Sequence, residues 1–330
     1  MQAIDAVISW VDGNDPIYQE KLNNYCAEHG INKKLAIEPT RIIQSNEIYY
    51  CLLSIKKFAP WIRNIYLITN QQIPAAISQI KDLEFTKKIK IVDQNILLKE
   101  NRILTPVFNS LSIEWIITQI KDLSDNFLYL NDDFFLIKSV SPEDFFKNNI
   151  MQLRGEWKTK AKSKFSYKFK RFICRLFNLK IPSPKTNQHR SWQEHSATIA
   201  GYKTKFYLLP HAPFPLNKTT FNTYIKENPE ALIKNASYPF RDLLQISAIP
   251  LMSHLDLKKN KAKHNPHSCQ AIMVNGAVHT FRKIKYRLQK AKKKNKIKFV
   301  CMQSIDEAPV DIKKFLLNWL QCQINMDLEL

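Results

Sequence analysis

Short apolar runs alternate with amphipathic stretches along the first 150 residues. The apolar runs have the length of buried strands and cover residues 3–11, 63–69, 88–92 and 127–130. Helices are predicted between them over residues 46–58 and 110–120, each after a residue suited to capping. Alternation of this kind is typical of a mainly parallel sheet with helices on both faces. The sequence therefore predicts an α/β, Rossmann-like fold.

The rest of the chain predicts a basic insertion and a second part of the core. A short helix is expected to start at 142–146, a helix with one apolar side covers 165–179, and a strand at 299–302 precedes an amphipathic helix at 309–325. With 330 residues, the chain is longer than most single domains. We divide it into a first part of the core (1–150), a basic, aromatic-rich helical insertion (151–190) and a second part of the core (191–330).

One stretch joins a buried strand to two adjacent carboxylates. The apolar run 127–130 ends at Asn131, Asp132 and Asp133. In open α/β sheets, ligands bind at the carboxyl ends of strands, where loops expose polar groups. A divalent cation relieves the repulsion between adjacent carboxylates, and hard oxygen ligands favour Mg²⁺ or Mn²⁺. The alternative is an ordinary solvated turn.

Three other features are candidates for a site. Asp12 and Asp15 follow the first strand in a strong turn signal, for which a local Asx-turn is the alternative. His211 lies between two prolines, whose fixed backbone angles suit the presentation of a side chain, although a lone histidine is more often structural. Arg241 follows an aromatic segment, where a packed ion pair is the usual role.

The net charge changes the picture in one respect. It is +21, and residues 157–192 and 282–298 contain neither Asp nor Glu. One-signed segments attract anionic partners such as nucleic acid, acidic lipid or phosphorylated substrates. Basic residues alternate with aromatic ones in the first segment, which suits binding to a membrane surface. A solvated insertion is an equal alternative. The charge could also serve to bind an acidic polysaccharide. No nucleic-acid-binding motif is present, so specific nucleic-acid binding is not expected.

The sequence also argues against a membrane span, a signal peptide, a zinc site and a glycine-rich phosphate-binding loop. No apolar run of about eighteen residues predicts a membrane span, and Asp5 inside the first apolar run argues against a signal peptide. The six cysteines form no CxxC pair and no zinc spacing, so thiols in a reducing cytosol are expected. With five glycines and neither GxGxxG nor GxxxxGK[ST], metal, Arg, Lys or His must hold any phosphate.

The order and text of these motifs resemble the conserved blocks of the Stealth family. The matching stretches are residues 4–16 (IDAVISWVDGNDP), Asn46-Glu47, residues 59–70 (APWIRNIYLITN), residues 108–110 with Glu114, residues 123–133, residues 144–146, residues 210–213 with Arg241, and residues 299–306 (FVCMQSID). The resemblance covers most of the chain and leaves residues 150–188 outside.

Stealth proteins are sugar-1-phosphate transferases of bacterial capsules and cell-surface glycans, related to the lysosomal N-acetylglucosamine-1-phosphotransferase. The resemblance implies a Rossmann-like, GT-A-like core with Mg²⁺ or Mn²⁺ as cofactor. It also implies transfer of a hexose- or N-acetylhexosamine-1-phosphate, typically from a UDP-sugar, to an acceptor glycan. The products would be a phosphodiester and UMP.

The resemblance further implies a role for each candidate residue. The metal ligands would be Asp132, Asp133 and Asp306. The substrate-binding residues would be Asp12, Asp15, Asn46, Glu47, Asn109, Ser110 and Glu114, the last of them bracing the donor loop. The catalytic residues would be His211, Arg241 and Asp133, with His211 as base or nucleophile and Arg241 stabilising charge on the phosphoryl group.

Two departures from the family bear on this assignment. Where many relatives read ELRYSLRSI, residues 47–55 read EIYYCLLSI and lack both arginines. Where relatives often read CINDN, residues 301–306 read CMQSID. A metal-dependent glycosyltransferase that releases UDP stays an alternative, and a nucleic-acid-binding protein is a more distant one.

The partners expected on this basis are a UDP-sugar donor, an acceptor oligosaccharide or lipid-linked glycan, and an anionic membrane surface. No specific nucleic acid is expected, and a homo-oligomer is left open. The expected location is the cytoplasm, peripheral to the inner face of a bacterial inner membrane.

Overall fold

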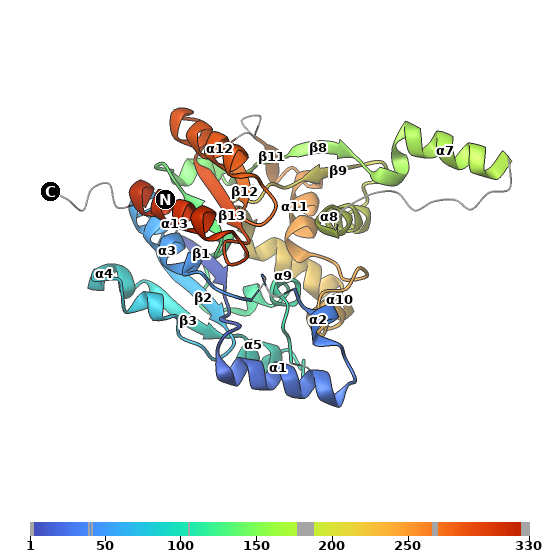
Figure 1. The fold of residues 1–330 in the computed structure, drawn as a ribbon. Helices are drawn as coiled ribbons and strands as arrows, with labels where there is room; N and C mark the ends of the chain where they lie inside the picture. Colours follow the sequence, from blue (N-terminus) through green and yellow to red (C-terminus); the bar gives the residue numbers. More distant parts are fainter. Residues whose placement is uncertain are drawn as a thin grey trace.

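In the computed structural model, the four predicted apolar runs and one later strand form a single sheet (Figure 1). Its order is β10-β4-β1-β2-β3, with β1 Ile4–Ser9, β2 Ile65–Thr69, β3 Ile89–Asp93, β4 Asn126–Asn131 and β10 Phe214–Asn217. The first four strands pair in parallel, and β10 pairs antiparallel with β4. Almost every residue of β1, β2 and β4 is buried, as expected for parallel strands covered on both faces. The predicted α/β class with a mainly parallel sheet is confirmed.

The structure describes residues 3–38, 40, 42–104, 106–176, 188–265 and 270–324. Within this part of the chain, no helix is long and apolar enough to cross a membrane. Four of its cysteines are buried free thiols and Cys322 is an exposed one. Cys269, residues 177–179 of the predicted basic helix, and Asn325 lie outside the described residues.

Helices lie around the central sheet on both sides (Figure 1). They are α1 Pro16–Glu28, α2 Lys33–Ala36, α3 Glu47–Phe58, α4 Leu83–Thr86, α5 Gln94–Glu100, α6 Ser110–Ile113, α7 Phe165–Leu176, α8 Gln188–Ile199, α9 Lys218–Glu227, α10 Pro229–Ala236, α11 Ala248–Lys258, α12 Phe281–Lys293 and α13 Val310–Ile324. The helix predicted at 46–58 is confirmed as α3, which buries Ile48, Leu52 and Ile55 at helical spacing. The C-terminal helix is confirmed as α13.

Three smaller sheets surround the core. Their orders are β12-β13-β5, β11-β7-β6 and β8-β9, with β5 Phe134–Leu136, β6 Phe146–Lys147, β7 Ile150–Leu153, β8 Glu156–Thr159, β9 Lys205–Leu208, β11 Ala262–His264, β12 Ala271–Asn275 and β13 Phe299–Gln303. β13 runs antiparallel to β5 and sets Cys301 opposite Phe134. The strand predicted at 299–302 is therefore confirmed, and it brings the C-terminal part of the chain beside Asp133.

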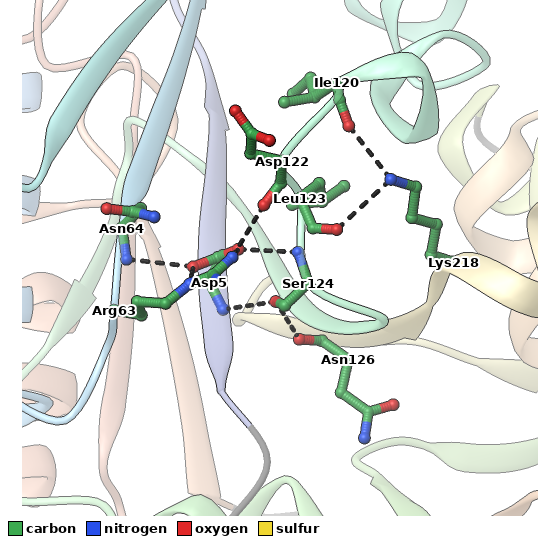
Figure 2. A network of polar contacts seen from close by, with 9 residues as sticks. All are labelled: Asp5, Arg63, Asn64, Ile120, Asp122, Leu123, Ser124, Asn126 and Lys218. Atoms are coloured by element: carbon green, nitrogen blue, oxygen red, sulfur yellow. Dashed lines mark hydrogen bonds and ion pairs between the residues drawn. The ribbon is translucent and has the colours of Figure 1, made fainter.

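A buried carboxylate ties together the starts of three strands (Figure 2). Asp5 is fully buried on β1 and accepts hydrogen bonds from the Arg63 guanidinium and from the backbone N–H groups of Asn64 and Ser124. Arg63 also donates to the carbonyl oxygen of Asp122. Asp5, which interrupts an apolar run in the sequence, thus forms a structural ion pair with Arg63. The pair lies at the edge of the sheet opposite the carboxyl ends of the strands.

The helix predicted over residues 110–120 is wrong in extent. α6 ends at Ile113, and a 3₁₀ turn at Ile117–Gln119 follows it. The helix was predicted from the spacing of four isoleucines, and all of them are buried, because this segment crosses the interior rather than lying on its surface: Ile113, Ile116, Ile117 and Ile120. β-branched residues are also poor helix formers. The short helix predicted at 142–146 is present as a 3₁₀ turn at Pro142–Asp144.

Candidate active site

A cavity of about 530 Å³ opens at the carboxyl ends of β1 and β4. These two strands are neighbours, and Ser9 pairs with Asn131 at their last residues. Segments distant in the sequence close the cavity, among them residues 107–114, 188–193 and 302–306. Of the predicted site residues, nine line it: Glu47, Asn109, Ser110, Glu114, Asp132, Asp133, His211, Arg241 and Asp306.

The turn between β4 and β5 places two carboxylates at the floor of the cavity. Oδ2 of Asp132 accepts a hydrogen bond from the Gln44 side chain at 2.9 Å. Oδ2 of Asp133 accepts one from the Cys301 thiol at 3.3 Å, while Met302 donates its N–H to the carbonyl oxygen of Asp133. Oδ1 of Asp133 is buried and has no hydrogen-bond partner within the described part of the chain. A buried carboxylate oxygen without a partner is costly, so it indicates a position for a bound group.

The acidic groups around this turn repel one another. Burial, followed by the charge of Asp132, raises the pKa of Asp133 to about 8. Burial and Asp132 likewise raise the pKa of Glu47 to about 7, with Asp306 adding to the effect. Burial raises the pKa of Asp132 as well. Full ionisation of the cluster is therefore unfavourable, and a bound cation would offset that cost.

The residues present fit a divalent cation that is held partly by the protein and partly by the substrate. Among the described residues, no three His, Cys, Asp or Glu side chains converge as a complete metal cage. Mg²⁺, however, is usually held by one or two carboxylates together with substrate phosphates. Asp132 and Asp133 would supply those carboxylates, and Asp306, which accepts a hydrogen bond from Thr40 at 2.8 Å, lines the same cavity.

Another part of the cavity wall carries the predicted arginine. Nη2 of Arg241 donates to Oγ of Ser110 at 2.8 Å, so the loop before α6 and the Arg241 segment meet at the cavity. The Asn109 side chain caps α6 through Ser112 and donates to the carbonyl oxygen of Tyr238. Both contacts tie the loop to the segment that carries Arg241.

Glu114 supports this wall from behind. Its carboxylate accepts a hydrogen bond from Ser247 at 2.9 Å, next to the first turn of α11. Burial raises the pKa of Glu114 to about 7, and the nearby Arg241 counteracts part of that increase. The arrangement fits the bracing role that the resemblance implied.

His211 lies on the third side, between β9 and β10. Its ring is partly exposed and meets Phe134 edge-on, with ring centroids 6.2 Å apart. Burial lowers the pKa of His211, so the imidazole is neutral at pH 7 and able to accept a proton. The structure thus brings the predicted histidine, arginine and carboxylates to one cavity.

Three predicted substrate-binding residues do not line the cavity. Asp15 caps α1 and accepts from the N–H of Tyr18. Asp12 accepts from the N–H of Asn14 in a local turn. Asn46 is exposed, with a φ of 67° at the start of α3. Asp15 and Asp12 thus make local structural contacts, and Asn46 lies at the start of a helix. A substrate-binding role for these three residues stays a prediction.

Sequence analysis missed several residues that contribute to the site. Gln44 and Cys301 hydrogen-bond to the two carboxylates, and His189 stacks on His211 with ring centroids 4.5 Å apart. Gln44 and His189 belong to no motif, and Cys301 lies in the 299–306 stretch, which pointed to Asp306 and not to the thiol. Their proximity to the site depends on contacts between segments far apart in the sequence, which spacing alone does not reveal.

Comparison with known families identifies two conserved regions in the chain. Residues 2–30 match the model of Stealth protein CR1, conserved region 1, and residues 41–154 match Stealth protein CR2, conserved region 2. The two regions include the Asp132-Asp133 turn, Glu47 and the Ser110 loop. His211, Arg241 and Asp306 lie beyond them.

Curated relatives carry related names. A capsular polysaccharide phosphotransferase of Actinobacillus suis is 32% identical over 224 residues, which cover 60% of this chain and 58% of that protein. An exopolysaccharide phosphotransferase of Streptomyces coelicolor is 31% identical over 252 residues, covering 76% of this chain and 39% of the relative. The chain thus spans less than two thirds of the length of these relatives.

One similar solved structure is the galactosyltransferase LgtC in complex with donor and acceptor sugar analogs. The two structures have a TM-score of 0.44 and 10% sequence identity, and the match covers 98% of this chain and 96% of LgtC. The apo structure of the bifunctional glycosyltransferase WbbM is similar with a TM-score of 0.39 and 11% identity, over 98% and 51% of the two chains.

Proposed function

Because the chain belongs to the Stealth family through its conserved regions 1 and 2, we propose that it is a sugar-1-phosphate transferase of bacterial cell-surface glycan synthesis. Its curated relatives are named capsular or exopolysaccharide phosphotransferases. The proposed donor is a UDP-linked hexose or N-acetylhexosamine, and the proposed acceptor is a hydroxyl group of a glycan in capsule or lipooligosaccharide synthesis.

The reaction transfers a phosphoryl group together with its sugar. The acceptor oxygen forms a bond to the β-phosphorus of the donor, and the bond from that phosphorus to the oxygen bridging to the α-phosphate breaks. UMP leaves with the bridging oxygen, and the hydroxyl proton goes to a base. The product is a phosphodiester between the transferred sugar and the acceptor.

His211 is the proposed base for the acceptor proton. Its lowered pKa keeps the ring neutral, and its partly exposed position in the cavity leaves a nitrogen within reach of substrate. Arg241 lines the same cavity and would stabilise negative charge on the transferring phosphoryl oxygens. The hydrogen bond from Arg241 to Ser110 orients the guanidinium before substrate arrives.

Asp132 and Asp133 would hold Mg²⁺ or Mn²⁺, with Asp306 as a further ligand. Such a cation would neutralise charge on the donor phosphates. Ser110, Asn109 and Glu114 would shape the donor loop, and Glu47 would stand beside the carboxylates. Asp12, Asp15 and Asn46 would act indirectly, through the turn and the helix starts that they occupy.

One observation carries the proposal: Asp133, whose buried Oδ1 has no hydrogen-bond partner among the described residues, lines the same cavity as His211 and Arg241. Metal-dependent glycosyl transfer, which would release UDP instead, is the alternative, because it also uses strand-end carboxylates and a nucleotide sugar. The two reactions differ in the nucleotide that is released.

A nucleotide product assay tests the proposal. The purified protein is incubated with UDP-sugars, Mg²⁺ and a glycan acceptor, and UMP is separated from UDP. We expect acceptor-dependent UMP, with the rate reduced on the order of a hundredfold or more in Asp133→Ala and His211→Ala. Glu307→Ala, which removes an exposed carboxylate outside the cavity, is the matched control and should keep the wild-type rate. Acceptor-dependent UDP in place of UMP would overturn the proposal.

The basic insertion suggests where the reaction takes place. In Figure 1, α7 extends away from the body of the molecule beyond the β8-β9 ribbon. Phe165, Phe169 and Leu176 are 83%, 57% and 65% exposed, and the rings of the two phenylalanines stack. Lysines at 164, 168 and 170 accompany them, without an acidic residue from 157 to 192. Apolar and basic groups on one helix suit the interface of an anionic membrane, so we place the enzyme peripherally at the inner face of the bacterial inner membrane.

A further inference from the structure

A second histidine lies against the proposed base. The rings of His189 and His211 are stacked, with centroids 4.5 Å apart and an angle of 23° between their planes. Both side chains line the cavity, and His189 comes from the first turn of α8. His189 lies outside the two matched conserved regions, residues 2–30 and 41–154.

α8 is itself fixed to the segment that carries His211. Gln193, one helical turn after His189, is buried. Its Oε1 accepts the N–H of Leu209 at 2.8 Å, and its Nε2 lies 3.2 Å from Nε2 of His189. A single amide therefore contacts both the His189 ring and the backbone two residues before His211.

The same helix also reaches the arginine. The indole N–H of Trp192 donates to the carbonyl oxygen of Asp242 at 2.9 Å, and the guanidinium of Arg241 lies 5.7 Å from the centre of the Trp192 ring. α8 thus has fixed contacts on both sides of the cavity, which makes it a rigid support for the His189 ring.

We propose that His189 is a positioning residue, whose ring face holds the imidazole plane of His211 in the orientation that accepts the acceptor proton. This inference rests on the proposed phosphotransferase function. The stacked ring restricts rotation of the His211 side chain, and aromatic rings favour such offset contacts. Burial, together with His211 and Arg241, lowers the pKa of His189, so a neutral ring lies beside the base and adds no competing charge. His189 itself carries no proton in the reaction.

Substitutions that keep or remove the ring separate this role from others. His189→Phe preserves a stacking face without ring nitrogens, and His189→Ala removes the face. We expect His189→Ala to lower kcat by about tenfold to a hundredfold, with the donor KM within about twofold, because a misoriented base slows chemistry rather than binding. His189→Phe should keep kcat within about threefold of wild type. His195→Ala, on the same helix but outside the cavity, is the control and should match wild type.

Three results would overturn the inference: an unchanged kcat in His189→Ala, a loss in His189→Phe as large as in His189→Ala, or a loss that appears only in KM. The second of these would assign the role to a ring nitrogen instead. Thermal unfolding of each variant shows whether a loss of kcat reflects misfolding.

A readout without turnover keeps this test separate from the proposed function. The ring C–H resonance of His211 is assigned in a proton–carbon NMR spectrum by its loss in His211→Gln. We expect His189→Ala to shift this resonance through the loss of the neighbouring ring current, and His189→Phe to leave it close to its wild-type position. If the wild type releases no UMP, the proposed function fails, and the NMR comparison still decides whether His189 orients His211. An unchanged resonance in His189→Ala contradicts the positioning role.

Discussion

The thiol of Cys301 donates a hydrogen bond to Oδ2 of Asp133, while Oδ1 of the same carboxylate is buried and has no partner among the residues that the structure describes. Cys301 lies on β13, which pairs with β5 directly after the Asp132-Asp133 turn. A strand from the end of the chain therefore fixes the orientation of a carboxylate from its first half. One oxygen is held by the protein, and the other is the one that we propose binds the cation.

Loss of this hydrogen bond should weaken cation binding. We expect Cys301→Ala to raise the Mg²⁺ concentration for half-maximal activity by about tenfold, because groups that orient metal ligands typically contribute this much to affinity. Cys301→Ser keeps a donor and should show a smaller change. Activity measured against Mg²⁺ concentration tests the expectation, and identical Mg²⁺ dependence in Cys301→Ala and wild type would show that Asp133 needs no such support.

Glu114 should make stability depend on pH. Its pKa is about 7 in the folded protein, above the ordinary value of 4.5, so between these values the folded state keeps a proton that the unfolded state has lost. Its contribution is present in full below pH 4.5 and is lost as the pH rises through about 7. Glu114→Gln has no such proton, so its free energy of unfolding should rise relative to wild type by up to about 3 kcal/mol from pH 4 to pH 8.

Urea unfolding at a series of pH values measures this difference. Glu143→Gln removes an exposed carboxyl group and is the control. A difference between wild type and Glu114→Gln that stays constant across the pH range would show that Glu114 is not protonated in the folded protein.

Asp5 should matter for stability rather than for catalysis. Asp5→Ala leaves the Arg63 guanidinium and two backbone N–H groups without their acceptor (Figure 2). Breaking a buried ion pair on one side typically costs about 3–5 kcal/mol, and the 44% exposure of the Arg63 side chain favours the lower end of that range. Urea unfolding gives the loss directly. A cost below about 1 kcal/mol would mean that solvent replaces these contacts with ease.

α7 should bind anionic membranes through its exposed phenylalanines and its lysines. We expect the wild type to float with liposomes that contain anionic lipid and not with neutral ones, since each basic residue near such a surface contributes about 1 kcal/mol. Phe165→Ser with Phe169→Ser should abolish most of the binding. Val310→Ser, which alters another exposed apolar residue at 84% exposure, should have no effect. Equal flotation with both kinds of liposome would remove the case for a membrane-binding helix.

The sequence predicted the sheet because its strands are continuous apolar runs, a pattern that parallel strands buried on both faces require. It predicted Asp132 and Asp133 for a related reason, since polar residues directly after a buried strand reach the ligand-binding edge. The same logic also selected Asp12 and Asp15, which here form a turn and a helix cap. In this fold the end of a strand is followed by the start of a helix, and acidic residues occur at both positions. Their presence alone therefore does not separate a ligand-binding residue from a helix cap.

Residues that act through contacts across the fold could not be predicted in the same way. Gln44, His189 and Cys301 approach the site from three segments whose order in the sequence says nothing of their distance in space. The isoleucines of residues 113–120 misled for a different reason, since complete burial and a helix face produce a similar spacing over a short segment.

The fate of the β-phosphorus tests the central claim most directly. UDP-sugar labelled with ³²P at the β-position is incubated with the protein, Mg²⁺ and an acceptor glycan, and the label is followed into product and nucleotide. Transfer of the phosphoryl group predicts that the label enters the glycan and that the released UMP is unlabelled. Label recovered in UDP, with an unlabelled glycan product, would contradict the account and show that the sugar alone is transferred.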